Sequence, residues 1–234
     1  MEKILTSINA LTFNTNNINN KIKNGYYDVD KRHFINLTNK YITMNSYDLS
    51  KCFNSNYTKK WHEYNELFEK YHCRDEYNPR FKVINYLKQF KNKEISIADF
   101  GCGDAFISKY FKENDYTCEY DLFNFSNIDL CDCDNDIIKC DMKNTLFKSK
   151  QFDFVIFCMS LWGNVTQNIN EALRVLNHNG KLIIVEEKDR WIYNNKNHLL
   201  SLICKTYNDS FVCVEHKTEI NKKYVFHILI KHYQ

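Results

Sequence analysis

The chain has 234 residues, 44% of them hydrophobic, which is enough to bury one sizeable core and a small appendage. No stretch approaches the roughly 18 apolar residues of a membrane span, and Met1–Ala10 lacks a basic region followed by a long apolar run, so we expect neither membrane insertion nor secretion. The formal net charge of +3 divides into +2, +4, −6 and +3 over residues 1–50, 51–94, 95–180 and 181–234. Basic flanks leave room for a polyanionic substrate, although solvated lysines explain any single positive charge equally well.

Ten cysteines lie within predicted strands and motifs, not at the loop spacings of a disulfide-stapled mini-protein. This distribution indicates reduced thiols in an intracellular compartment. Cys131-Asp132-Cys133 with Cys140 could suggest zinc. No second Cys-x-x-Cys or His pair stands at finger spacing, so we expect no metal site.

Residues 1–55 are rich in asparagine, with five asparagines in Asn14–Asn20, and we interpret them either as a partly disordered extension or as an irregular helical cap. The domain proper is expected at 56–234. Its first predicted helix, Tyr57–Tyr71, carries a stripe of large apolar side chains, and a second begins at Asn78-Pro79 with proline in the first helical position. Such stripes are more typical of core packing than of ligand platforms.

A predicted strand over 95–100 ends in Gly101-Cys102-Gly103 and leads into a helix over 104–113. Two of only five glycines stand in this loop, where they allow a close backbone approach to a ligand and present free N–H groups. The pattern fits an adenosine cofactor such as NAD or S-adenosylmethionine, and a plain tight turn is the alternative.

Acidic residues are predicted to end the next two strands. Asp121 lies 20 residues after Gly101, at the end of a predicted strand over 117–122, where a carboxylate suits a ribose diol. A strand over 136–140 leads to Asp141, which could accept from an adenine amino group, and Met142, which could pack on the base.

The remaining pattern alternates as in a doubly wound sheet: a strand over 152–159, a helix from Thr166 as N-cap to Leu176, and a strand over 181–185 after Gly180. A helix over 196–207 and strands over 211–218 and 223–231 follow. The closing hairpin favours an α/β class I methyltransferase fold, with a Rossmann-like seven-stranded sheet, over a nicotinamide enzyme.

Four segments occur in order and carry a family resemblance: "ADFGCGDA" at 98–105, "CDM" at 140–142, "FCMSLWG" at 157–163 and "EALRVL" at 171–176. Over roughly residues 57–234 the chain resembles the ribosomal RNA-processing protein eight family, also called nucleomethylin. The resemblance implies S-adenosylmethionine as cofactor, methyl transfer to N1 of an adenosine in large-subunit ribosomal RNA, and a nuclear or nucleolar location, with the cytoplasm as the alternative.

Position by position, the resemblance implies cofactor contacts at His72, Gly101, Asp121, Asp141, Met142 and Cys158, with Gly103 completing the loop. The segment after His72 is shorter than in the family, and residues 123–136 read as an insertion between the second and third strands. The N-terminal elements are the expected lid and RNA-contact region.

The implied reaction needs little proton transfer, because adenine N1 is a neutral lone pair at physiological pH. We consider three side chains as candidates for positioning the substrate: Ser160, Trp162 and Glu186. Trp162 could stack on a flipped adenine or cover the sheet edge, and Glu186 could face the cationic product or pair with nearby basic residues. Cys158 is not expected to act as a nucleophile. The alternative functions are a methyltransferase acting on a small molecule or protein, and a non-catalytic cofactor-binding module that recognises RNA or chromatin.

Overall fold

The computed structural model describes residues 29–53, 58–73, 78–114, 118–131, 134–188, 192–193, 196–197, 199, 201, 203, 211–220 and 224–231. The helices are α3 (Val29–Ile42), α4 (Ser46–Phe53), α5 (Thr58–His72), α6 (Arg80–Leu87), the 3-10 turn η3 (Lys88–Phe90), α7 (Phe106–Asn114) and α8 (Val165–Val175). The strands are β1 (Ile95–Phe100), β2 (Phe123–Asp129), β3 (Ile137–Lys139), β4 (Phe152–Cys158), β5 (Leu176–Glu187), β6 (Ile192–Tyr193), β7 (Lys196–Asn197), β8 (Phe211–Ile220) and β9 (Tyr224–Lys231).

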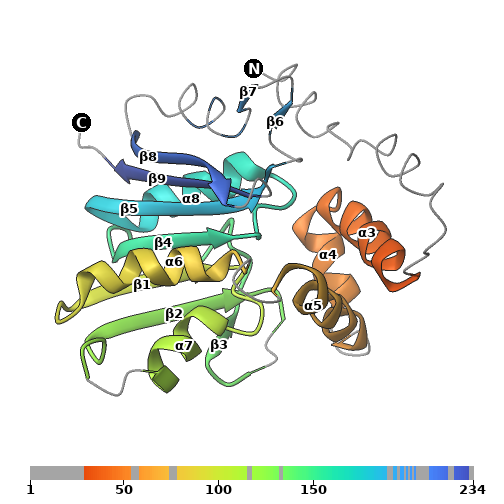
Figure 1. The fold of residues 1–234 in the computed structure, drawn as a ribbon, viewed down its shortest axis with the longest axis horizontal. Helices are drawn as coiled ribbons and strands as arrows, with labels where there is room; N and C mark the ends of the chain where they lie inside the picture. The colour runs from red at the N-terminus through yellow and green to blue at the C-terminus, as the bar shows by residue number, and fades with distance from the viewer. Residues whose placement is uncertain are drawn as a thin grey trace.

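A seven-stranded sheet forms the centre of the structure, in the order β3-β2-β1-β4-β5-β9-β8 (Figure 1). Strands β1 to β5 pair in parallel, whereas β9 runs antiparallel to both β5 and β8. The predicted seven-stranded fold with an antiparallel C-terminal hairpin is therefore confirmed. Strands β6 and β7 form a separate two-stranded ribbon.

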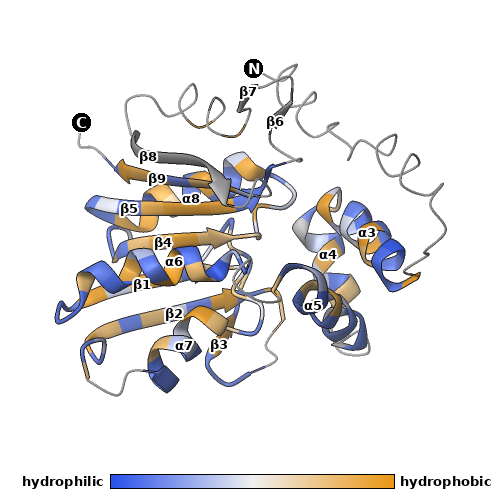
Figure 2. Ribbon diagram, viewed as in Figure 1, coloured by the Kyte–Doolittle hydropathy of each residue, from blue (hydrophilic) through white to orange (hydrophobic). Residues whose placement is uncertain are grey.

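Apolar side chains bury both faces of the sheet. Helices α6 and α7 pack on one face around Ile84 and Phe111, and α8 packs on the other around Ile169. Figure 2 shows β4 and β5 as predominantly hydrophobic strands, as expected for parallel strands covered on both sides.

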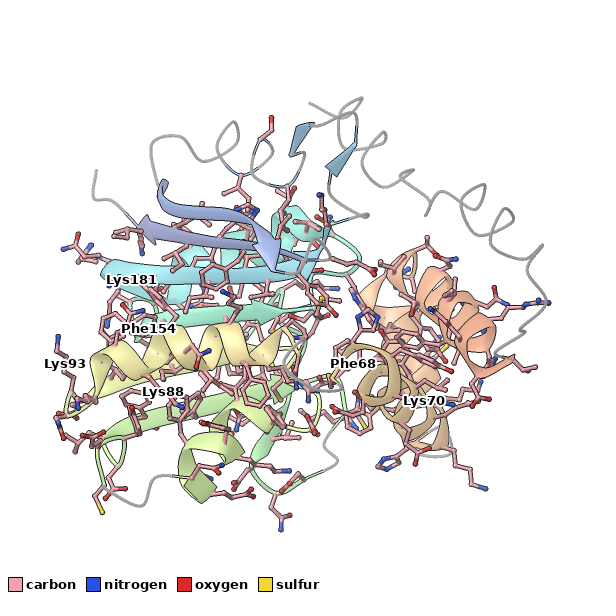
Figure 3. All side chains as sticks on the ribbon, viewed as in Figure 1. Phe68, Lys70, Lys88, Lys93, Phe154 and Lys181 are labelled. Carbon is pink, nitrogen blue, oxygen red and sulfur yellow. The ribbon has the colours of Figure 1, made fainter. Side chains whose placement is uncertain are left out.

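Helices α3, α4 and α5 form a unit that we call the helical cover. Its own core includes Phe34, Tyr41, Phe53 and Tyr64, all buried. Figure 1 shows the cover beyond the carboxyl ends of the parallel strands. In Figure 3, Phe68 lies where α5 faces the sheet, whereas Phe154 and Lys181 lie at the opposite end of the strands. The carboxyl ends are where open α/β sheets bind ligands.

The prediction of the second strand over residues 117–122 is wrong. Residues 118–122 form bends and turns, and β2 is Phe123–Asp129, inside the segment interpreted as an insertion. The alternating Phe123, Asn124 and Phe125 pair with β1 from Ile95 onward.

Other element boundaries also differ from the predictions. Helix α8 begins at Val165, and its N-cap is Asn164, whose side chain accepts from the Gln167 backbone, so the assignment of Thr166 is wrong. Gly180 lies within β5 and does not end a helix. Of the helix predicted over 196–207, residues 196–197 form β7, and much of the remainder lies outside the described residues, as does Asn14–Asn20.

Candidate functional site

The glycine loop after β1 is fixed by backbone conformation and by packing. Gly101 and Gly103 have φ of 72° and 60°, in the left-handed region that favours glycine. A Cβ on Gly101 would stand 2.6 Å from Cβ of Ser160. The Ser160 hydroxyl donates to the Phe100 carbonyl at 2.5 Å and so ties the end of β4 to the end of β1. Close contact with Ser160 is therefore a reason for Gly101 that the sequence did not reveal.

The carboxylate at the end of β2 belongs to Asp129. Its Oδ2 accepts from the Gly103 backbone N–H at 2.9 Å, and its Oδ1 accepts from the Cys131 N–H at 3.2 Å and from Trp61 Nε1 at 3.4 Å. Loss of hydration raises the pKa of Asp129 to about 6, against the opposing effect of these hydrogen bonds. Asp129 joins the glycine loop to the helical cover.

Asp121 does not reach this site. It lies in the turn before β2, at the amino end of the strand, and lines a separate hollow with Glu94 and Asn124. The prediction of Asp121 as the ribose acid depended on a strand ending there, whereas the acid that ends β2 in the structure is Asp129. Asp129 stands 12 residues before Asp141 and, like it, closes a short strand, which is the signal that the sequence offered.

Asp99 is a further acidic side chain that the sequence analysis did not single out. It is only 2% exposed on β1, two residues before Gly101. Burial raises the pKa of Asp99 to about 7, the charge of Arg80 opposes this, and the charge of Asp129 adds to it. A carboxylate among the apolar residues 97–100 of this strand was the available signal.

Arg80, at the start of α6, is a buried cation beside these acids. Its guanidinium pairs with Glu69 of α5 at 2.5 Å and with Asp104 of the glycine loop at 3.3 Å. It also lies 4.9 Å from the ring centre of Phe106 and 5.4 Å from that of Phe68. Arg80 thus connects the cover, α6 and the loop.

A cavity of about 250 Å³ opens between the strand ends and the cover. Of the predicted site residues, it brings together Gly101, Gly103, Asp141, Met142, Cys158, Ser160 and Trp162. The sheet side also contributes Asp99 and Asp129, and the cover contributes mostly apolar and aromatic side chains, including Leu49, Phe53, Trp61, Tyr64 and Phe68. Trp162 meets Tyr64 edge to face, with 5.2 Å between ring centres. The cavity therefore has an acidic wall and an aromatic wall.

Besides Asp121, two predicted residues are not among those that line the cavity. His72 ends α5, where its Nδ1 is 2.9 Å from the Tyr224 hydroxyl and its ring stacks on Phe68. Glu186 is 1% exposed, and its Oε1 accepts from the Leu161 backbone N–H at 2.8 Å. Both hold elements that border the site.

The described thiols near the site are suited to packing, not to nucleophilic chemistry. Burial raises the pKa of both Cys102 and Cys158 well above the usual value, so these thiols stay protonated at neutral pH. Seven cysteines of the described chain are free thiols: Cys52, Cys73, Cys102, Cys118, Cys131, Cys140 and Cys158. In the same described part of the chain, no group of three or more His, Cys, Asp or Glu side chains could hold a metal ion, and no helix is long and apolar enough to span a membrane.

The chain is similar to known proteins in family, in sequence and in fold. A family model described as a hypothetical methyltransferase matches residues 17–232. The chain is 40% identical over 118 residues to Ribosomal RNA-processing protein 8 of Arabidopsis thaliana, covering 50% of this chain and 37% of that protein. It is 31% identical over 141 residues to the 25S rRNA (adenine(645)-N(1))-methyltransferase of Schizosaccharomyces pombe, covering 54% and 42%. The match spans less than half the length of both relatives.

Among solved structures, the chain is similar to the Burkholderia thailandensis 1,6-didemethyltoxoflavin-N1-methyltransferase, which was crystallised with S-adenosylhomocysteine. The TM-score is 0.56 at 12% identity, over 81% of this chain and 92% of that one. The [4+2]-cyclase SpnF gives a TM-score of 0.52 at 13% identity, over 69% and 84%. At these identities the likeness concerns the fold alone, and a cyclase on the same fold shows that function must be argued from the site.

Proposed function

Because the chain belongs to the hypothetical methyltransferase family, we propose that it binds S-adenosylmethionine in this cavity and methylates N1 of an adenosine in large-subunit ribosomal RNA. One observation carries the proposal: acidic side chains at the ends of the three neighbouring strands β1, β2 and β3 surround the glycine loop and face an aromatic cover. The names of the two relatives, a ribosomal RNA-processing protein and an rRNA adenine-N1 methyltransferase, support the choice of acceptor.

The cavity residues fit the chemical groups of this cofactor. Asp129 would accept from the ribose hydroxyls, while Asp141 and Met142 would contact the adenine. Asp99 would accept from the ammonium group, and Arg80 would face the carboxylate. The acidic wall suits a ligand that carries a sulfonium as well as an ammonium group.

When bound, S-adenosylmethionine supplies an electrophilic methyl group. Adenine N1 has its own lone pair, so this chain needs no general base and contributes alignment and the exclusion of water. Tyr64 and Trp162 provide aromatic surface on the cover side for a flipped base. Ser160 and Glu186 would act indirectly, by positioning the loop that follows β4. Their side chains already form hydrogen bonds with the Phe100 carbonyl and the Leu161 N–H, respectively.

The decisive experiment incubates the full chain with methyl-tritiated S-adenosylmethionine and unmodified large-subunit ribosomal RNA, followed by digestion to nucleosides. We expect the label in 1-methyladenosine. Label in a small-molecule or protein fraction alone would favour the alternative acceptors. Binding of S-adenosylhomocysteine without any methylated product would favour a non-catalytic module. An rRNA acceptor also favours a nuclear or nucleolar location, which a fluorescent fusion of the full chain tests.

A matched pair of variants tests the cofactor assignment. Replacement of Asp129 by Asn should weaken S-adenosylhomocysteine binding about 10-fold or more, the scale of a hydrogen bond to a charged group. Asp121→Asn serves as the control, because this exposed acid lies at the other end of β2 and should leave the affinity unchanged. Calorimetric titration measures both, and equal effects of the two changes would contradict the placement of the ribose.

A further inference from the structure

Asn65 is a polar residue on the face of α5 that meets the cavity, between Trp61 and Phe68. Its Nδ2 donates to the Trp61 carbonyl at 2.9 Å. A carbonyl oxygen can only accept, so the amide group must face the Trp61 carbonyl with Nδ2. The amide oxygen Oδ1 therefore points away from that carbonyl. In the described part of the chain, Oδ1 makes no hydrogen bond.

The free acceptor lies over the glycine loop. Oδ1 of Asn65 would be the nearest atom to a Cβ on Gly103, at 3.4 Å. The N–H of the same glycine donates to Asp129, and Trp61, one turn before Asn65, donates to the other oxygen of that carboxylate. Asn65 Oδ1 and the Asp129 carboxylate therefore both lie next to Gly103, one contributed by the cover and one by the sheet.

We infer that Asn65 is a cofactor-binding residue contributed by the cover, whose Oδ1 accepts a hydrogen bond from a ribose hydroxyl of the nucleoside held by Asp129. This rests on the proposed function for the identity of the cofactor. A vicinal diol presents two donors, and Asp129 already receives three protein hydrogen bonds, so a second acceptor beside it completes the site. Ribose binding then holds α5 over the loop, because the contact joins cover and sheet through the ligand.

The test measures binding of S-adenosylhomocysteine and of its 2′-deoxy and 3′-deoxy analogues by calorimetry. We expect Asn65→Ala to weaken binding of the parent compound about 3- to 10-fold, the range of one neutral hydrogen bond. One of the two deoxy analogues should bind the wild type and the variant equally, because it lacks the hydroxyl that donates a hydrogen bond to Asn65 Oδ1. Asn36→Ala is the matched control, an exposed amide on α3 outside the cavity, and should leave all three affinities unchanged.

The possible outcomes separate this inference from the proposed function. If wild-type protein binds none of the three compounds, the cofactor proposal fails with it. If Asp129→Asn weakens binding but Asn65→Ala does not, the cofactor proposal stands and the role of Asn65 is wrong. If each analogue loses the same fraction of affinity, relative to the parent compound, in the variant as in the wild type, the inference about Asn65 is likewise overturned. If both deoxy analogues bind the wild-type protein as tightly as the parent compound, neither hydroxyl is bound and the inference is overturned.

Discussion

Replacement of Asp99 by Asn should make the ligand-free protein more stable at neutral pH while it weakens cofactor binding. Asp99 is 2% exposed, and burial, together with the charges of Asp129 and Asp104, raises its pKa to about 7 in spite of the nearby Arg80. The ionised carboxylate of Asp99 therefore lowers the free energy of unfolding. An amide of nearly the same shape removes the charge and the acceptor that we assign to the ammonium group.

The magnitude follows from the two pKa values. The folded protein holds the Asp99 proton up to about pH 7, and the unfolded chain releases it near pH 3.8. Between these values the folded state binds more protons, so the contribution of Asp99 to stability falls as the pH rises and is level above about pH 7. Three pKa units correspond to about 4 kcal/mol, an upper bound because the neighbouring Asp129 shares part of the repulsion. The stability gain of Asp99→Asn should therefore grow from near zero at pH 4 to at most about 4 kcal/mol at pH 8.

Urea unfolding at several pH values between 4 and 8 measures this difference, in which the titration of groups that do not interact with Asp99 cancels. Asp153→Asn is the contrasting control. Burial alone would raise the pKa of Asp153, but hydrogen bonds from Ser96 and Asn177 outweigh it and hold the pKa below its usual value. That replacement should destabilise the protein at pH 7. A stability difference for Asp99→Asn that does not change with pH, or that shrinks toward pH 8, would refute the reasoning.

Two further pairs of substitutions test the loops around the site. Gly101→Ala should destabilise the protein by about 2 kcal/mol or more, since it adds left-handed strain to a 2.6 Å contact with Ser160, whereas Gly103→Ala should cost only about 1–2 kcal/mol because its nearest contact is 3.4 Å away. Urea melts that show equal costs would contradict the packing argument. Glu186→Gln keeps an acceptor for the Leu161 N–H and should retain methyl transfer, whereas Glu186→Leu leaves this buried donor unpaired and should cost about 1–3 kcal/mol. Loss of transfer in a folded Glu186→Gln protein would indicate that its charge acts on the substrate.

The sequence predicted the sheet well because its central strands are marked by burial. Strands β4 and β5 contain Val155 and Ile183 in runs of fully buried apolar residues, and Gly101 marks the turn that follows β1. Strand β2 was missed because its exposed and half-buried positions carry Asn124 and Ser126, which have low strand propensity. The error in this one strand placed the acid at its carboxyl end eight residues too early, at Asp121 instead of Asp129.

The aromatic wall of the site could not be derived in the same way. The periodicity of α5 correctly predicts a helix with a buried stripe, but periodicity alone does not say what the stripe packs against. Part of it, Phe34 against Tyr64, is internal to the cover, while Trp61 reaches Asp129 across 68 positions of sequence. Asn65 does not belong to the apolar pattern at all. The role that we infer for it depends on the direction of its amide, which only the structure shows.

The charges at the strand ends explain why this region suits a cationic ligand. Asp99 and Asp129 both have raised pKa values, so neither carboxylate is fully compensated by the surrounding protein. The charge of the buried Arg80 acts on Asp99, but its guanidinium already pairs with Glu69 and Asp104. A positively charged ligand would supply the missing counter-charge and lower both pKa values on binding. The residues that weaken the ligand-free fold are thus those that we expect to strengthen the complex, a relation typical of functional sites.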